Sequence, residues 1–248
     1  LLQVTLKKGE VIQKTLKIKN SKDSAVNLKF SLSNSLNQFA SIPSNSLTLN
    51  TNSEGLLSIN FFSHEKTAIG VYTGKIIVDD GNFIREIPVV INVNDRKSLF
   101  DIGISLDNKN IKSGQDLGFN LNLFNLGETG RVDAIVEYLI KDFEGNVIAK
   151  KEETVAVETR ASLNNKFNIP LNLVSGKYSI AAIVKYGNFS GVSSDTFEVI
   201  NGIRYFFVII FILIVLILGI IFYFPIRTIL NRKIALDTLK NSLKNKAV

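Results

Sequence analysis

An uninterrupted apolar run near the C-terminal end constrains this chain more than any other feature. Residues 205–224 read YFFVIIFILIVLILGIIFYF, twenty residues without a charged or amide side chain. A helix rises 1.5 Å per residue, so a run of this length spans a bilayer hydrocarbon core, which is about 30 Å thick. A buried helix of a globular domain would need a polar face over such a length. The run therefore predicts one transmembrane helix.

The charges that flank this run predict its orientation. One basic residue lies in the twelve positions before it, whereas three follow it closely. Because basic residues stay on the cytoplasmic side, we expect the N-terminal bulk outside the cell and the C-terminal tail inside. Aromatic rings with a polar tip favour the headgroup level. The residues expected at the two membrane interfaces are Tyr205, Tyr223, Arg204, Arg227, Arg232 and Lys233.

The predicted span holds no ionisable side chain, so it indicates an anchor and not a proton or ion path. The tail, residues 225–248, places apolar residues at roughly the spacing of one helical face, with Lys and Arg between them. We expect a short amphipathic cytoplasmic helix. Two interpretations stay open, a basic helix lying on the anionic inner leaflet and a docking helix for a protein partner.

Net charge does not indicate a nucleic-acid-binding protein. The whole chain carries +7, but the residues before 205 hold 23 basic and 21 acidic side chains, a net charge of only +2. Most of the excess lies beside the predicted membrane span, where anionic lipid accounts for it. No basic face is clustered enough to predict DNA or RNA binding, and no glycine-rich loop predicts a nucleotide site.

The first 200 residues alternate apolar and polar side chains with a period of two, as half-buried strands do. Seven short strands in about 100 residues are typical of an immunoglobulin-like sandwich. We predict an all-β fold with two tandem sandwiches, residues 1–95 and 96–200, which meet at the polar joint 94–97. Pro88 lies inside the last strand of the first domain, which predicts an edge or bulged position there. Residues 144–146 predict a hairpin turn.

The two predicted domains share a local motif. Gly70-Val71-Tyr72-Thr73 and Gly176-Lys177-Tyr178-Ser179 each open a late strand after a polar loop. A tyrosine at such a corner buries its ring and bonds its hydroxyl to nearby backbone. We therefore expect Tyr72 and Tyr178 to be structural residues.

Sequence patterns in the two halves resemble known repeats. The first half contains LKKGEVIQKTLKIKN, GVYTGKIIV and IPVVINV, and it resembles the Ig-like repeats of archaeal surface and membrane proteins, relatives of which accompany glycosidase modules. The second contains NLFNLGETG, YLIKDFEGNVI and SGKYSIAAIVKYG, and it resembles the adhesion-type repeats of the CARDB and fibronectin-like kind. This resemblance implies a fold and a cell-envelope setting, without a specific ligand.

Few residues are candidates for catalysis or ligand binding. We therefore expect that the protein is not an enzyme and binds no cofactor. The single histidine, His64, lies in a charged loop, and the chain has no cysteine, so a catalytic triad or a zinc site is not expected. Two acidic turns could offer oxygens to calcium, but turn chemistry alone explains their composition. These residues are Asp79, Asp80 and Asn82 in the first domain, and Asp142 and Glu144 in the second.

A glycan is more readily expected on the protein than in a binding site. Sugar sites usually present an aromatic platform, and the chain has no tryptophan. Asn188-Phe189-Ser190 is a glycosylation sequon, which we expect on a turn near the membrane.

Two functions fit these observations. The first is a single-pass cell-surface protein of the plasma membrane, with a structural, adhesive or protein-binding ectodomain whose partners are the bilayer and a surface-layer or other protein. The second is a non-catalytic accessory subunit of a membrane complex, while a glycan-binding module is a third, weaker option. No small-molecule substrate is expected. The chain begins at Leu1, and we expect a signal peptide to have been removed upstream.

Overall fold

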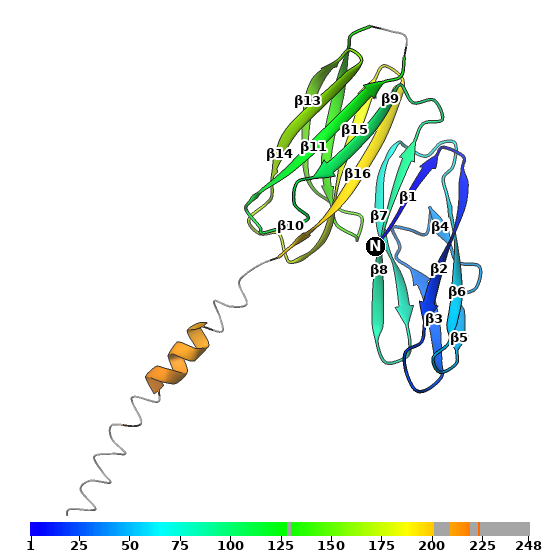
Figure 1. The fold of residues 1–248 in the computed structure, drawn as a ribbon, viewed down its shortest axis with the longest axis vertical. Helices are drawn as coiled ribbons and strands as arrows, with labels where there is room; N and C mark the ends of the chain where they lie inside the picture. The colour runs from blue at the N-terminus through cyan, green and yellow to red at the C-terminus, as the bar shows by residue number, and fades with distance from the viewer. Residues whose placement is uncertain (128–129, 201–208, 219–222, 224–248) are drawn as a thin grey trace, which may run out of the picture. The chain divides into compact units, whose positions relative to one another are not determined.

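A computed structural model describes residues 1–127, 130–200, 209–218 and 223. Residues 1–200 form one compact unit, which consists of two β-sandwich-like domains, named sandwich 1 and sandwich 2 (Figure 1). The strands of sandwich 1 are β1 (Leu2–Lys7), β2 (Val11–Lys19), β3 (Val26–Leu32), β4 (Ala40–Ser41), β5 (Ser46–Leu49), β6 (Glu54–Phe62), β7 (Gly70–Asp79) and β8 (Ile84–Asn94). The strands of sandwich 2 are β9 (Phe100–Leu106), β10 (Asn110–Ile111), β11 (Asp116–Asn125), β12 (Val132–Lys141), β13 (Val147–Val157), β14 (Arg160–Asn168), β15 (Gly176–Tyr186) and β16 (Phe189–Val199).

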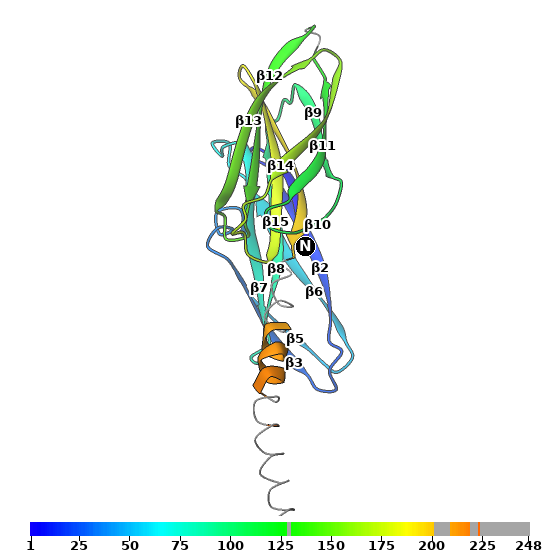
Figure 2. The ribbon, with the colours of Figure 1, turned by 90° about the vertical axis from the view of Figure 1, so that its left-hand side faces the viewer.

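The two sandwiches share the topology of the five-stranded sheet and differ in the third strand of the other sheet, where β4 joins β6 but β9 joins β11. Each has a five-stranded sheet, in the order β1-β8-β7-β3-β5 in sandwich 1 and β10-β16-β15-β12-β13 in sandwich 2. The first strand of each order pairs in parallel with the last strand of its domain, β1 with β8 and β10 with β16. The opposing sheet in each sandwich has three strands, in the order β2-β6-β4 in sandwich 1 and β14-β11-β9 in sandwich 2. Each of these sheets contains an equivalent antiparallel pair, β2 with β6 and β11 with β14. Figure 2 shows the layers from the side.

Alternation along the strands builds a separate core in each sandwich. In β8, for example, Val89, Ile91 and Val93 point inward and are fully buried, in register with inward residues of β7. In sandwich 2 the largest fully buried side chain is Tyr138, whose ring packs 5.0 Å from that of Phe119 on the opposing sheet. Both cores are assembled from every second residue, as the period of two predicts.

Most predicted strands are present, and two details differ. The short strands β4 and β10 were not predicted, because two residues are too few to show alternation. Strand β13 has a charged and exposed middle, which interrupts the alternation expected of a half-buried strand. The predicted turn at 144–146 is confirmed, with Gly145 at φ +98°.

Pro88 occupies a local edge, as its lack of an N–H predicts. It pairs with Lys75 of β7, but β1 joins the other side of β8 only from Val89 onward, opposite Leu2. The polar joint 94–97 lies between the end of β8 and the start of β9.

The predicted membrane segment is described only in part. Residues 209–218 form a helix whose side chains are exposed. Among the described residues, no helix has both the length and the apolar character that crossing a membrane requires. The rest of the predicted span and the predicted tail helix at 225–248 lie outside the described residues.

Candidate functional site: the junction between the sandwiches

The five-stranded sheets of the two sandwiches pack against each other through their outer faces. These faces should meet water in an isolated sandwich, yet they form a third apolar cluster, separate from both cores. Its buried members are Val71 and Val90 of sandwich 1 and Phe143, Ala181, Ile183 and Val192 of sandwich 2. The sandwiches are therefore joined by a dry contact and not only by a linker.

Hydrogen bonds align the same two faces at the end of β8. The Ser194 hydroxyl donates to Asn92 Oδ1 at 2.7 Å, and both residues are buried. Gln3 Nε2 donates to the Ser194 carbonyl at 3.0 Å. Asn94 bonds the backbone of Val192 twice, accepting from its N–H at 2.6 Å and donating to its carbonyl at 3.2 Å. The buried Asn92 and the half-buried Asn94 both have matched partners, and this specifies one register because a slip would leave these amides unpaired.

The turn between β12 and β13 closes the other side of the junction. Lys141 Nζ donates to the Val71 carbonyl at 3.0 Å and lies 5.8 Å from the ring centroid of Tyr72. Burial lowers the pKa of Lys141 below its usual value. Lys75 makes ion pairs with Glu144 at 2.5 Å and Glu86 at 2.7 Å, and these bonds raise the pKa of Lys75. The turn thus binds sandwich 1 through two lysines, one from each domain.

Gly145 lets this turn approach sandwich 1 closely. A Cβ at Gly145 would lie 3.2 Å from Cβ of Ser35 and 3.8 Å from the Thr73 carbonyl oxygen, and its φ of +98° disfavours other residues. Thr73, on the same face, carries the one buried side-chain oxygen among the described residues that lacks a hydrogen-bond partner, Oγ1. The linker is held as well, since Arg96 Nε donates to the Lys8 carbonyl at 2.9 Å.

Both predicted tyrosine corners are confirmed. The Tyr72 hydroxyl donates to the Ala68 carbonyl at 2.8 Å, and the Tyr178 hydroxyl donates to the Val174 carbonyl at 3.0 Å. Each bond reaches four residues back, and Gly70 and Gly176 open their strands as predicted. Burial raises the pKa of both phenols, so the hydroxyls stay protonated donors.

The carboxylates of the two acidic turns accept hydrogen bonds from backbone N–H groups within the same turn. Asp80 Oδ1 accepts from the N–H groups of Asn82 and Phe83, and its other oxygen pairs with Lys22 at 2.9 Å, which together lower the pKa of Asp80 to about 2. Asp142 Oδ1 likewise accepts from the N–H groups of Glu144 and Asn146. Within the described part of the chain, no three His, Cys, Asp or Glu side chains gather in a way that could hold a metal ion.

His64 is exposed, and its ring lies 5.8 Å from that of Phe62, edge to face. Among the predicted interface anchors, the structure describes Tyr223, whose side chain is exposed. Arg204, Tyr205, Arg227, Arg232 and Lys233 lie outside the described residues.

Asn188 lies on a turn, as predicted. It occupies the two-residue turn between Tyr186 and Phe189 and is exposed. The strand β16 runs eleven residues from this turn to Val199, which corresponds to roughly 33 Å. The sequon therefore lies at the opposite end of sandwich 2 from Ile200, and nearness in sequence to the predicted span does not place it near the membrane.

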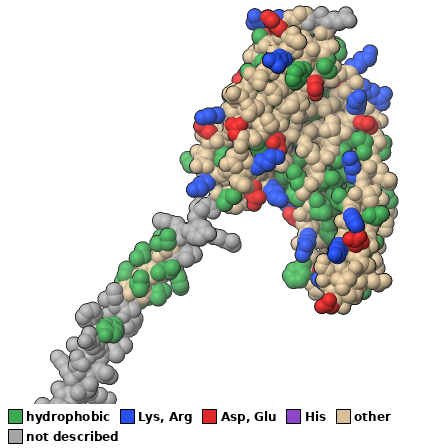
Figure 3. Space-filling view, viewed as in Figure 1, with side chains coloured by type: hydrophobic (Ala, Val, Ile, Leu, Met, Phe, Trp, Pro, Cys, Tyr) green, Lys and Arg blue, Asp and Glu red, His purple; other side chains and the backbone are tan. Residues whose placement is uncertain are grey.

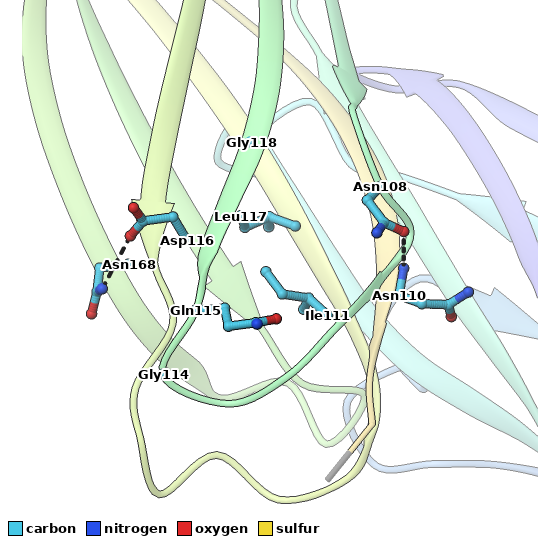
Figure 4. A pocket seen from close by; sticks show the side chains of 9 residues that line it. All are labelled: Asn108, Asn110, Ile111, Gly114, Gln115, Asp116, Leu117, Gly118 and Asn168. Carbon is cyan, nitrogen blue, oxygen red and sulfur yellow. Dashed lines mark hydrogen bonds between the residues drawn. The ribbon is translucent and has the colours of Figure 1, made fainter. Parts of the chain in front are cut away.

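A shallow cavity of about 610 Å³ opens beside β10, at the end of sandwich 2 where β16 finishes (Figure 4). Amide side chains dominate its rim, and its one carboxylate, Asp116, accepts a hydrogen bond from Asn168 Nδ2 at 3.1 Å. Asn108 Oδ1 accepts from the Asn110 N–H at 2.9 Å, as in a local turn. The apolar lining comes from the buried residues Ile111 and Leu117, which belong to the core. These groups can accept and donate hydrogen bonds.

Sequence reasoning missed the junction, although a signal was present. Ile180-Ala181-Ala182-Ile183-Val184 is an unbroken apolar run in β15, and Val89-Val90-Ile91 is another in β8. Strands buried on both faces read as continuous apolar runs, whereas half-buried strands alternate. The runs mark the two strands whose outer faces meet.

Comparisons with known proteins add a likeness in fold. No protein-family model matches the chain, and no curated protein matches its sequence. Among solved structures, the CupB2 chaperone of Pseudomonas aeruginosa is similar over 79% of this chain and 97% of its own, at 11% identity and a TM-score of 0.32. The CARDB domain of a Pyrococcus furiosus protein, in complex with di-metal ions, is similar over 41% of this chain and 90% of its own, at 14% identity and a TM-score of 0.30.

Proposed function

We propose that this chain is a single-pass membrane-anchored cell-surface protein whose two-sandwich ectodomain has a structural, adhesive or protein-binding role. The observation that carries the proposal is the order of its parts. A pair of sandwiches in apolar contact, residues 1–200, is followed after four residues by a twenty-residue run without a charge or amide. Such a run favours a bilayer span, and the basic residues after it favour an outside location for the sandwiches.

The character of the described surface supports a non-catalytic role. On the face drawn in Figure 3, Lys and Arg side chains are interspersed with Asp and Glu, without a broad field of one sign. Ion pairs account for several of these charges, for example Glu137 with Lys150 and Lys185, each at 2.7 Å. Mixed charge keeps a projecting domain soluble and gives no electrostatic funnel for a polyanion.

The test begins with the membrane. The full chain, expressed with a signal peptide and a tag, should stay with membranes through an alkaline wash. Protease added to intact cells should reach the sandwiches and spare the tail. The substitution Ile214→Arg, in the middle of the predicted span, should increase the fraction of protein released from the membrane by the wash, because a charge at the bilayer centre is costly. Release of the unsubstituted chain by the wash would refute the proposal.

Extraction in a mild detergent then separates the proposed role from an accessory subunit. Mass spectrometry of co-purifying chains should recover the protein alone or with surface-layer material. Stoichiometric recovery of the same membrane proteins, lost when residues 205–248 are exchanged for an unrelated anchor, would instead identify a complex subunit.

A further inference from the structure

Large apolar side chains are most exposed at one end of the two-sandwich unit. In the described residues up to Ile200, six large hydrophobic side chains expose 66% or more of their surface. Four of them occupy two loops, Leu171 (85%) and Val174 (68%) between β14 and β15, and Phe83 (67%) and Ile84 (68%) at the β7–β8 hairpin. Single exposed apolar residues are common on protein surfaces, whereas groups of them indicate an interaction site. Here two adjacent or nearby apolar side chains are exposed on a loop of each domain.

Both loops lie at the end of the unit from which the chain leaves. Gly176, just after the β14–β15 loop, is in register with Val199, next to the exit at Ile200. Across the junction β8 and β16 run in opposite directions, since Asn92 bonds Ser194 while Asn94 bonds Val192. The start of β8, with Phe83 and Ile84, therefore lies toward the end of β16. Figures 1 and 2 both show the β7–β8 hairpin reaching in the direction in which β16 runs.

The groove at this end of the junction fixes the relative level of the two loops. Lys75 and Pro88 line it from sandwich 1, and the segment 174–178 lines it from sandwich 2. Pro88 is thus level with the start of β15, and the hairpin tip continues about 15 Å further along β8, at about 3.3 Å per residue. Sandwich 1 reaches at least as far as sandwich 2 on this side.

Hydrogen bonds and buried side chains hold the backbone of both loops in place. In the β14–β15 loop, Leu173 is buried and donates its N–H to the Pro170 carbonyl at 3.1 Å, and the Tyr178 hydroxyl holds Val174. At the hairpin, the Phe83 N–H is bonded to Asp80. Lys22 Nζ lies 5.9 Å from the centroid of the Phe83 ring, a basic group beside an exposed aromatic ring.

We infer that these two loops seat the ectodomain on the outer leaflet, with Leu171, Val174, Phe83 and Ile84 inserted at the headgroup–acyl boundary. The inference rests on the proposed function. Only five residues of sequence lead from Ile200 to Tyr205, and a chain of that length can reach no more than about 17 Å when fully extended. Apolar and aromatic side chains beside a basic group favour that boundary. The two loops thus bind the same bilayer that holds the predicted membrane anchor.

The absence of tryptophan makes the test direct. Four single variants of the full chain, Leu171→Trp, Phe83→Trp, Val11→Trp and Leu126→Trp, are reconstituted in vesicles of phosphatidylcholine and phosphatidylglycerol. Val11 and Leu126 are exposed to a similar degree but lie near the other end of their domains, since Glu10 bonds Ser63 and Leu126 bonds Leu99. Emission is then compared between vesicles with and without bromine on the lipid acyl chains.

The expected result is blue-shifted emission, quenched by brominated lipid, for Leu171→Trp and Phe83→Trp, with neither effect for the two controls. Inserted protein in which either loop position behaves like the controls would overturn the two-loop seat. Equal quenching of all four positions would also overturn it, because it would indicate aggregation on the vesicles. Protein that fails to float with the vesicles after an alkaline wash would refute the proposed membrane anchor itself, a separately recognisable failure.

Discussion

The Ser194 hydroxyl donates a 2.7 Å hydrogen bond to Oδ1 of Asn92, across the junction and 102 residues away in sequence. Both residues are buried, and both point outward from their own sandwich. Neither contributes to the core of its own domain. In an isolated sandwich both side chains would face water. Covering them with the second sandwich would cost free energy if it left them unpaired, and the hydrogen bond avoids that cost. The bond therefore belongs to the association of the two domains.

A double-mutant cycle on this pair should show coupling. Asn92→Ala and Ser194→Ala should each lower the free energy of unfolding by about 1–3 kcal/mol, because each leaves a buried partner group unsatisfied. The double variant should be more stable than the sum predicts, by roughly 1 kcal/mol. Denaturant unfolding measures all four corners of the cycle. The matched control pair, exposed Thr48 with Asn27, should show coupling near zero; equal coupling in both cycles would contradict the role given to the junction.

A charge in the apolar cluster of the junction should separate the sandwiches without unfolding them. Val90 is fully buried there but is not part of the core of sandwich 1. Val90→Asp would bury an unpaired carboxylate unless the two faces part, so parting is the lower-energy outcome. Small-angle scattering should show a larger radius of gyration, with unchanged β circular dichroism. Val11→Asp, at an exposed position on β2, should leave the scattering curve unchanged.

Removing the unsatisfied hydroxyl of Thr73 should stabilise the protein. Valine has nearly the shape of threonine, so Thr73→Val keeps the packing and deletes Oγ1, the one buried side-chain oxygen without a hydrogen-bond partner in the described part of the chain. We expect a gain of about 1 kcal/mol in the free energy of unfolding. Thr154→Val, on the exposed part of β13, should change the stability far less. A loss of stability at Thr73 would mean that the hydroxyl has a partner in solution.

Glu137 should make stability depend on pH in the acidic range. Hydrogen bonds from Lys150 and then Lys185 lower the pKa of Glu137 below 4.5. A carboxylate with a lowered folded pKa stabilises the fold above its unfolded pKa, and the contribution is lost as pH falls through the folded value. The stability difference between the native chain and Glu137→Gln should thus be full at pH 6 and shrink below about pH 4.5. A difference that stays constant down to pH 3 would exclude this ion-pair origin.

The strands and corners of the fold could be predicted because they depend on local patterns. Alternation indicated a strand at the position of each strand longer than two residues, but it did not give all of their bounds, because the charged middle of β13 and the polar first half of β16 do not alternate. The Gly-x-Tyr motif predicted both tyrosine bonds, since the donor and acceptor lie four residues apart in sequence. Pro88 predicted a local edge for a reason contained in its own ring.

The junction depends on pairs far apart in sequence, and no local pattern specifies such pairs. The apolar runs around Val90 and Ile183 indicate strands covered on both faces, but they do not say what covers them. Nearness in sequence is a poor guide to position along a sandwich for a related reason, because the eleven residues of β16 carry the chain from the turn at Asn188 to the other end of the domain. The contribution of Gly145 emerges only where a turn of one domain meets Ser35 of the other.

The parallel pairing of β1 with β8 has a mechanical consequence. Six residue pairs, Leu2 with Val89 through Lys7 with Asn94, hold the first strand along its whole length. Tension applied at Leu1 along the strand axis would strain the hydrogen bonds of this seam together, in shear, and would not open them one after another. In sandwich 2 the strand that leads to Ile200 is held in the same parallel sense by β10. Leu1 and Ile200 lie toward the same end of the unit, because Leu2 is in register with Val89 and Pro88 is level with the start of β15. A load applied to that end along the strands would therefore put both terminal strands in shear.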